Sequence, residues 1–143
     1  MSTALVLPSS MLRLALRADA LVSGAAALLH LAGGGPLAAA LGLPASLVWG
    51  SGVFIAAYAA ALVVLARAAR LHRALIALVV FGNLGWSAAC VALALGAPWP
   101  LTAWGEAWLL AQALAVAALA AWQGAGWRAS PVQAPALSTV RTA

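Results

Sequence analysis

Four apolar runs divide the chain, and each is long enough to cross a lipid bilayer as a helix. A span needs about 20 residues at ~1.5 Å of rise per residue. The pattern predicts spans over about 12–32, 45–66, 74–95 and 102–123. Breakers separate the runs: Gly33 to Pro36, the basic turn Arg67 to Arg73, and Gly96 to Pro100. The predicted fold class is therefore an all-α integral membrane protein, a four-transmembrane-helix bundle.

The segments outside the spans give weaker signals. Leu37 to Pro44 is too short to cross and is expected at the membrane interface. The dipeptide Trp-Gly opens the second and the fourth spans, which suggests two helical hairpins in a weak parallel repeat. We expect one transmembrane domain over residues 1–128, to which Met1 to Ser10 add little, with Met11 as an alternative start. Residues 129–143 hold prolines, serines and threonines and are expected to form a disordered cytoplasmic tail.

Composition supports the membrane assignment. Of the 143 residues, 66% are hydrophobic and 6% are charged, and the mean hydropathy is +1.08. A soluble domain carries roughly a quarter charged residues, so a soluble enzyme, a nucleic-acid-binding domain and a disordered chain are excluded. The net charge of +5 does not indicate nucleic acid here, because all seven basic residues are arginines at the ends of apolar runs. The wealth of alanine, leucine and glycine, without lysine, is typical of a GC-rich bacterial genome.

The arginines predict the orientation of the chain. With four spans, every arginine falls on one side of the membrane, and the loops on the other side carry none. The positive-inside rule then predicts a multi-pass protein of the bacterial cytoplasmic (inner) membrane with both termini cytoplasmic. The expected charge anchors within the bundle are Arg13, Arg17, Arg67, Arg70, Arg73 and Arg128. Tryptophans are typical interfacial anchors, here Trp49, Trp99, Trp104 and Trp108 on the outer side and Trp122 and Trp127 on the inner side.

Asp19 is the sharpest candidate for a functional residue, because it lies inside the first span. A carboxylate at mid-membrane costs about 2.5–3.5 kcal/mol on insertion scales, whereas an interhelical hydrogen bond returns only ~0.6 kcal/mol on average. One neutral partner therefore does not offset the charge. Helical periodicity places Ser23 and His30 on the same face as Asp19, toward the bundle. We expect Asp19 to pair with an arginine of the Arg67 to Arg73 turn, to reach water, or to stay protonated.

The other strongly polar mid-span residues fall at similar depths. Counted from the cytoplasmic helix ends, Asp19, Tyr58 and Asn83 lie at roughly 10–14 Å and Gln112 at ~18 Å. Each comes from a different span, so the four predict one intramembrane polar layer. The layer is either a proton or substrate site or a packing clasp that fixes helix pairing. The clasp is the more frequent use of Asn and Gln in membranes.

The remaining chemistry is sparse. His30 and Glu106 lie near the outer boundary and could pair, but two ligands do not make a metal site. His72 lies a membrane away from His30, so the two histidines cannot ligate one haem, and Cys90 is expected to be a packing residue. No nucleophile, base and acid set and no phosphate-binding loop occurs. We expect no enzyme activity, no cofactor, no metal and no nucleic-acid partner.

The arginine-opened first span with Asp19 and Ser23-Gly24, the third-span Asn83-Leu84-Gly85-Trp86 and the fourth-span Gln112 resemble small uncharacterised bacterial four-helix membrane proteins, loosely grouped as DoxX-like. That resemblance implies a link to respiratory oxidoreductase subunits and quinone, without a set of site residues. The chain is also similar to small multidrug resistance transporters, which implies a proton-coupling role for Asp19. It departs from them in the position of Asp19 near the cytoplasmic end and in its strong charge bias.

Three functions follow as hypotheses. The first is a non-enzymatic bundle that acts as an accessory or assembly partner of other membrane proteins, or associates with itself as a homo-oligomer in the lipid bilayer. The second is a small proton-coupled transporter that uses Asp19. The third is a quinone- or haem-associated respiratory subunit.

Overall fold

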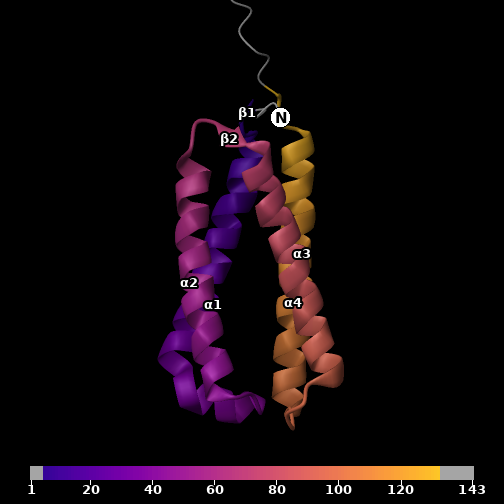
Figure 1. The fold of residues 1–143 in the computed structure, drawn as a ribbon. Helices are drawn as coiled ribbons and strands as arrows, with labels where there is room; N and C mark the ends of the chain where they lie inside the picture. The colour runs from indigo at the N-terminus through magenta and orange to yellow at the C-terminus, as the bar shows by residue number, and fades with distance from the viewer. Residues whose placement is uncertain (1–4, 133–143) are drawn as a thin grey trace, which may run out of the picture.

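The computed structural model describes residues 5–132, and in this range the chain folds into four long helices (Figure 1). They are α1 (Ser10–Leu41), α2 (Ala45–Arg67), α3 (Arg73–Gly96) and α4 (Ala103–Arg128). Two-residue strands precede α1 and α3, β1 (Leu5–Val6) and β2 (Leu71–His72). Each helix is long and apolar enough to cross a membrane. The predicted all-α, four-helix fold class is therefore confirmed.

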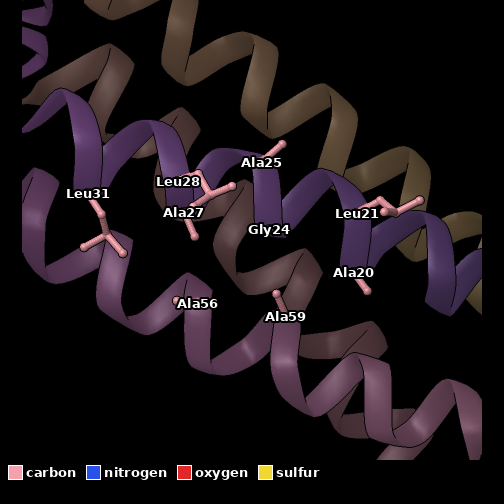
Figure 2. A pocket seen from close by; sticks show the side chains of 9 residues that line it. All are labelled: Ala20, Leu21, Gly24, Ala25, Ala27, Leu28, Leu31, Ala56 and Ala59. Carbon is pink, nitrogen blue, oxygen red and sulfur yellow. The ribbon is translucent and has the colours of Figure 1, made fainter.

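The helices form two hairpins, α1 with α2 and α3 with α4, which are joined through packing of α1 against α4 (Figure 1). By contrast, the backbones of α2 and α3 lie further apart, and side chains bridge them, with Tyr58 hydrogen-bonded to Asn83 and Phe54 stacked on Trp86. α1 and α2 approach closely at Gly52 of α2, where an added Cβ would lie 2.9 Å from Cβ of His30. Elsewhere Ala20 and Ala27 of α1 face Ala56 and Ala59 of α2 across a shallow apolar groove (Figure 2). The helix backbones are thus closely packed where α1 meets α2 and α4, and more widely spaced between α2 and α3.

The glycine–proline segment bends α1 and does not end it. Gly34 has φ 40° and ψ −121°, a conformation that glycine tolerates because it has no Cβ. Beyond Pro36 the helix resumes and continues to Leu41. This last stretch contacts the start of α4, because the Thr102 hydroxyl donates to the Ala40 carbonyl at 2.7 Å. The predicted break at Gly33 to Pro36 is therefore present as a kink at Gly34, and the helical segment beyond it, to Leu41, was not expected.

Both ends of the described chain meet at one end of the bundle, which we call the terminal end. There β1 pairs antiparallel with β2, with Val6 opposite Leu71. Val6 also forms a bridge with Val132, and the Leu7 amide donates to the Pro131 carbonyl at 3.1 Å. The expectation that the first ten residues add little is wrong, since Val6 is only 1% exposed. The first residues of the expected tail, 129–132, belong to the fold, and 133–143 lie outside the described residues.

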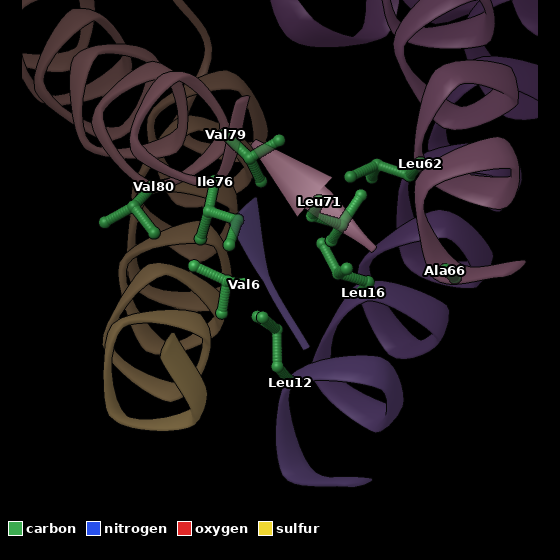
Figure 3. Close-up of a cluster of buried hydrophobic side chains, with 9 residues drawn as sticks. All are labelled: Val6, Leu12, Leu16, Leu62, Ala66, Leu71, Ile76, Val79 and Val80. Atoms are coloured by element: carbon green, nitrogen blue, oxygen red, sulfur yellow. The ribbon is translucent and has the colours of Figure 1, made fainter. Parts of the chain in front are cut away.

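An apolar cluster fills the terminal end and connects the two hairpins (Figure 3). Its side chains come from β1, α1, α2, β2 and α3, and are Val6, Leu12, Leu16, Leu62, Ala66, Leu71, Ile76, Val79 and Val80. Ser9 adds polar ties, because its hydroxyl donates to the Gly126 carbonyl at 2.9 Å and accepts from the Leu12 amide at 3.1 Å. That second bond caps the start of α1. The two hairpins are therefore fixed relative to each other at the terminal end.

Gly126 sets the approach of α4 to α1, and a matched glycine nearby allows a test. A Cβ on Gly126 would lie 2.7 Å from the backbone of Leu12, whereas one on Gly124 would meet nothing within 4 Å. We expect Gly126→Ala to lower the free energy of unfolding by about 1–3 kcal/mol through overpacking. Gly124→Ala should be neutral or stabilising by up to about 1 kcal/mol, because alanine favours helix. Thermal unfolding in detergent measures both, and equal effects would contradict this packing.

Candidate functional site

Asp19 lies on the face of α1 that points into the bundle, as its helical spacing predicts. Asp19, Ser23 and His30 are all buried, and Asp19 is 1% exposed. Residues four apart are neighbours on a helix surface, and the Ser23 hydroxyl accordingly donates to Oδ1 of Asp19 at 2.9 Å. The first contact of the carboxylate is therefore made within its own helix.

The other three helices each supply one donor to Oδ2 of Asp19. From α4 the Gln123 amide donates at 2.6 Å, and from α3 the Asn83 amide donates at 2.7 Å. From α2 the Tyr58 hydroxyl lies 3.0 Å from Oδ2 and 2.9 Å from Oδ1 of Asn83, so its single hydrogen serves one of these acceptors at a time. Asp19 is thus the centre of a hydrogen-bonded set that reaches all four helices.

The two amides of this set also bind each other, with Asn83 Nδ2 donating to Gln123 Oε1 at 3.1 Å. Asn83 therefore uses both amide hydrogens, one on Asp19 and one on Gln123. Each amide presents nitrogen toward Oδ2 of Asp19, which accepts both hydrogen bonds. We call the five residues the Asp19 cluster, which comprises Asp19, Ser23, Tyr58, Asn83 and Gln123.

The partners of Asp19 are all uncharged. Arg13 instead caps the end of α2, where its guanidinium donates to the Ala68 carbonyl at 2.9 Å. Arg73 of the turn lies over the ring of Trp127, 5.7 Å from the ring centroid. The expected pairing of Asp19 with an arginine of the turn is therefore wrong. Within residues 5–132, the four hydrogen-bond partners of the Asp19 carboxyl group are all neutral, and none supplies a positive charge.

A cavity of about 670 Å³ lies between α2 and α3 and borders the Asp19 cluster. Its walls are mainly aliphatic and aromatic, and its polar lining residues are Ser23, Tyr58, Asn83 and Gln112. Phe54 and Trp86 stack across it with ring centroids 5.8 Å apart. The lining residues Phe54 and Leu78 are also exposed on the surface of the bundle, at 59% and 69%. The cavity therefore opens sideways, toward the space that lipid occupies around a membrane protein.

Three of the four residues of the predicted polar layer come together, and the fourth does not join them. Asp19, Tyr58 and Asn83 are hydrogen-bonded, whereas Gln112 lines the cavity elsewhere. The amide from α4 is Gln123, which the sequence analysis placed at the last residue of its span. Because α4 continues to Arg128, Gln123 lies inside the helix. Extending the predicted fourth span to Arg128 would have placed Gln123 inside the membrane and made it a candidate partner of Asp19.

The predicted pair of His30 and Glu106 is not formed. His30 Nδ1 lies 2.9 Å from the Ser51 hydroxyl, and Glu106 is exposed in the first turn of α4. The physical reason is rotation of the helices, which turns His30 inward and Glu106 outward. The expectation is therefore wrong for this pair.

The expected anchors take different positions. Among the tryptophans, Trp104 and Trp49 face outward, at 78% and 48% exposed. Trp108 instead turns inward, with its ring centroid 5.9 Å from that of His30. Most of the arginines predicted as charge anchors are exposed, and these are Arg17, Arg67, Arg70, Arg73 and Arg128.

The other cavities and clusters of the described residues hold few polar or reactive side chains. The groove between α1 and α2 is lined only by alanine, leucine and glycine (Figure 2). Cys90 is buried in an apolar cluster with Leu109 and Ala113. Within residues 5–132, no group of three or more His, Cys, Asp or Glu side chains could hold a metal ion. The Asp19 cluster with its cavity is therefore the candidate functional site.

No family model, curated protein or solved structure matches the chain. The resemblance to DoxX-like proteins therefore stays a prediction.

The two glutamines of α4 provide a matched test of the cluster. Gln123→Leu keeps the approximate volume but removes a donor from Asp19, so it should lower the free energy of unfolding by about 1.5–3 kcal/mol, the usual value for a hydrogen bond to a charged group. Gln112→Leu should change it by less than about 0.5 kcal/mol, as for substitutions away from such networks. Thermal unfolding of both variants in detergent checks this. If Gln112→Leu lowered the free energy of unfolding more than Gln123→Leu does, Gln112 and not Gln123 would be the partner of Asp19.

Proposed function

We propose that this chain is a small, non-enzymatic membrane protein that binds a lipid-soluble cation in the cavity between α2 and α3. Asp19 supplies the counter-charge. The observation that carries the proposal is a buried carboxylate with only neutral partners, three of which line the cavity.

The charge of Asp19 is the first argument. Moving a carboxylate into a low-dielectric interior costs several kcal/mol even after the protein relaxes. The four donors of the cluster offset part of that cost through charge-assisted hydrogen bonds. They do not cancel the charge, and a cation beside the cluster would. An anionic or neutral head group in the same place gains no such attraction.

The shape of the cavity is the second argument. Small-molecule sites have volumes of about 300–1,000 Å³ and apolar walls with a few polar groups, as this cavity does. The walls suit the apolar body of a lipid-soluble molecule, and the polar groups suit its head. Aromatic faces also attract cations, and Phe54, Tyr58 and Trp86 all line the cavity.

Binding at Asp19 provides a route to transport. A proton and a cation compete for one carboxylate, and each therefore weakens the binding of the other. Exchange of the two across the membrane would be proton-coupled transport, the second hypothesis from the sequence. We rank the accessory role below it, because that role rested on the lack of a recognisable site. We rank quinone binding lower because a neutral head leaves the carboxylate uncompensated.

The proposed setting is the bacterial cytoplasmic membrane with both termini cytoplasmic. This rests on the arginine distribution and on the contact of Val6 with Val132, which places the two ends of the described chain together.

Reporter fusions test this orientation. A phosphatase that is active only outside the cytoplasm should be inactive when fused after Arg128 and active when inserted between Ala97 and Leu101. A cytoplasmic fluorescent reporter should give the reverse pattern. High phosphatase activity after Arg128 would contradict the proposed orientation.

Charge-matched probes test cation binding. Tetraphenylphosphonium and tetraphenylborate have the same shape and opposite charges. We expect the phosphonium ion to bind the purified protein at least about tenfold more tightly than the borate, and Asp19→Asn to weaken phosphonium binding about tenfold or more, a difference of ~1.4 kcal/mol. Equilibrium dialysis in detergent measures the four affinities.

Glu106→Gln is the matched control, because Asp19 and Glu106 are the only two acidic residues of the chain. It removes the same charge from an exposed position and should leave phosphonium binding unchanged. If folded Asp19→Asn binds the phosphonium ion as well as the unaltered protein does, the proposed site is wrong. If Asp19→Asn lowers only the stability and no probe binds, the cluster is a packing clasp.

A further inference from the structure

A second polar site lies toward the end of the bundle opposite the terminal end, around His30. The imidazole is 4% exposed and contacts Ser51 of α2 and Trp108 of α4. Two polar atoms of this site, Nε2 of His30 and Nε1 of Trp108, are buried without a hydrogen-bond partner among the described residues. A buried polar atom left without a partner costs about 1–3 kcal/mol. Two such atoms on facing rings indicate a site that a ligand group can complete.

Ser51 determines which nitrogen of His30 carries the proton. The Ser51 oxygen lies 3.0 Å from the Val48 carbonyl oxygen and 2.9 Å from Nδ1 of His30. Because a carbonyl oxygen only accepts, both contacts are hydrogen bonds when the single hydroxyl hydrogen is donated to Val48. The Ser51 oxygen is therefore the acceptor in its contact with His30, and Nδ1 of His30 is the donor at 2.9 Å. In a neutral imidazole the other nitrogen then carries a lone pair. Nε2 of His30 is thus a buried hydrogen-bond acceptor.

Trp108 supplies the complementary atom, since an indole nitrogen only donates. The ring centroids of His30 and Trp108 are 5.9 Å apart and the rings are tilted by 45°. A ligand group that hydrogen-bonds to both nitrogens must donate a hydrogen to Nε2 of His30 and accept one from Nε1 of Trp108. A hydroxyl does both with one oxygen. An ether or carbonyl oxygen cannot donate, and an ammonium group cannot accept.

The His30 site lies directly beyond the cavity between α2 and α3. The cavity lining includes Ala26, Ile55 and Gln112. His30, Ser51 and Trp108 each lie one helical turn further along the same three helices, about 6 Å away. The His30 site is therefore the next layer of side chains beyond the cavity along the helix axes.

We infer that His30 and Trp108 form a binding site for a hydroxyl group, held between His30 Nε2 and Trp108 Nε1. The hydroxyl belongs to a lipid-soluble alcohol or phenol that enters through the cavity, or to a water molecule. The inference does not depend on the charge of Asp19 and concerns a different end of the cavity.

Tryptophan indole signals provide the test. Protein labelled with ¹⁵N-tryptophan gives one indole signal for each of its seven tryptophans, and loss of a signal in Trp108→Phe assigns Trp108. The probes are para-butylphenol and para-butylanisole, which differ by a methyl group on the oxygen. We expect the phenol to shift the Trp108 signal saturably, with an affinity about tenfold higher than that of the anisole. In His30→Leu that preference should disappear.

The variants separate a local effect from misfolding. The signals of the other tryptophans report whether His30→Leu is folded. Ser51→Ala is a milder second variant, because it keeps the imidazole and removes the acceptor that fixes its tautomer. It should reduce the preference for phenol over anisole without abolishing binding.

The outcomes distinguish the two sources of the hydroxyl. A shift selective for phenol assigns the site to a ligand. A cross-relaxation signal between water and the Trp108 indole proton, lost in His30→Leu and unaffected by phenol, assigns it to water. If phenol and anisole act equally on the unaltered protein and no water signal is present, the inference is overturned.

Discussion

The carboxylate of Asp19 is the constraint on which the rest of the bundle depends. It is buried in a chain that is two-thirds hydrophobic, and its hydrogen-bond partners within residues 5–132 include no arginine. Its hydrogen bonds must therefore come from neutral groups, and α1, α2, α3 and α4 each supply one. Donors on four separate helices can all reach one carboxyl group only if each helix is fixed in its rotation about its own axis and in its position along the bundle. Buried polar contacts of this kind specify packing between helices that are otherwise uniformly apolar.

The terminal end and the cavity follow from the same arrangement. The apolar cluster of Figure 3 and the strands β1 and β2 fix the two hairpins close to the Asp19 cluster. Further along, the backbones of α2 and α3 lie further apart, and Ser23, Tyr58 and Asn83 line the cavity between them. Rigid fixation at one end with separation further along brings a charged, hydrogen-bonded cluster to the border of an apolar space. That combination supports the proposed binding site, because a packing clasp needs no space beside its polar groups.

Sequence reasoning predicted the elements well and their mutual orientation less well. Hydropathy and helix periodicity were sufficient for the four helices and for the inward face with Asp19, because both depend on local spacing. The depths of the residues along their spans correctly predicted that Tyr58 and Asn83 lie beside Asp19. They predicted Gln112 in place of Gln123, because the fourth span was predicted to end too early. The kink at Gly34 and the separation of α2 from α3 depend on tertiary contacts. Apolar residues on every face of a helix do not indicate which face meets a neighbour.

The state of the Asp19 carboxyl group is the most direct test of the account. Asp19 is the only aspartate in the chain, so ¹³C-labelled aspartate places an infrared label on this one group. At neutral pH in lipid bilayers, we expect the isotope-shifted bands of an ionised, hydrogen-bonded carboxylate, and a further shift in Gln123→Leu. An isotope-shifted carbonyl band of a protonated acid would contradict the account, because a neutral Asp19 would need no counter-charge and would provide no attraction for a cation.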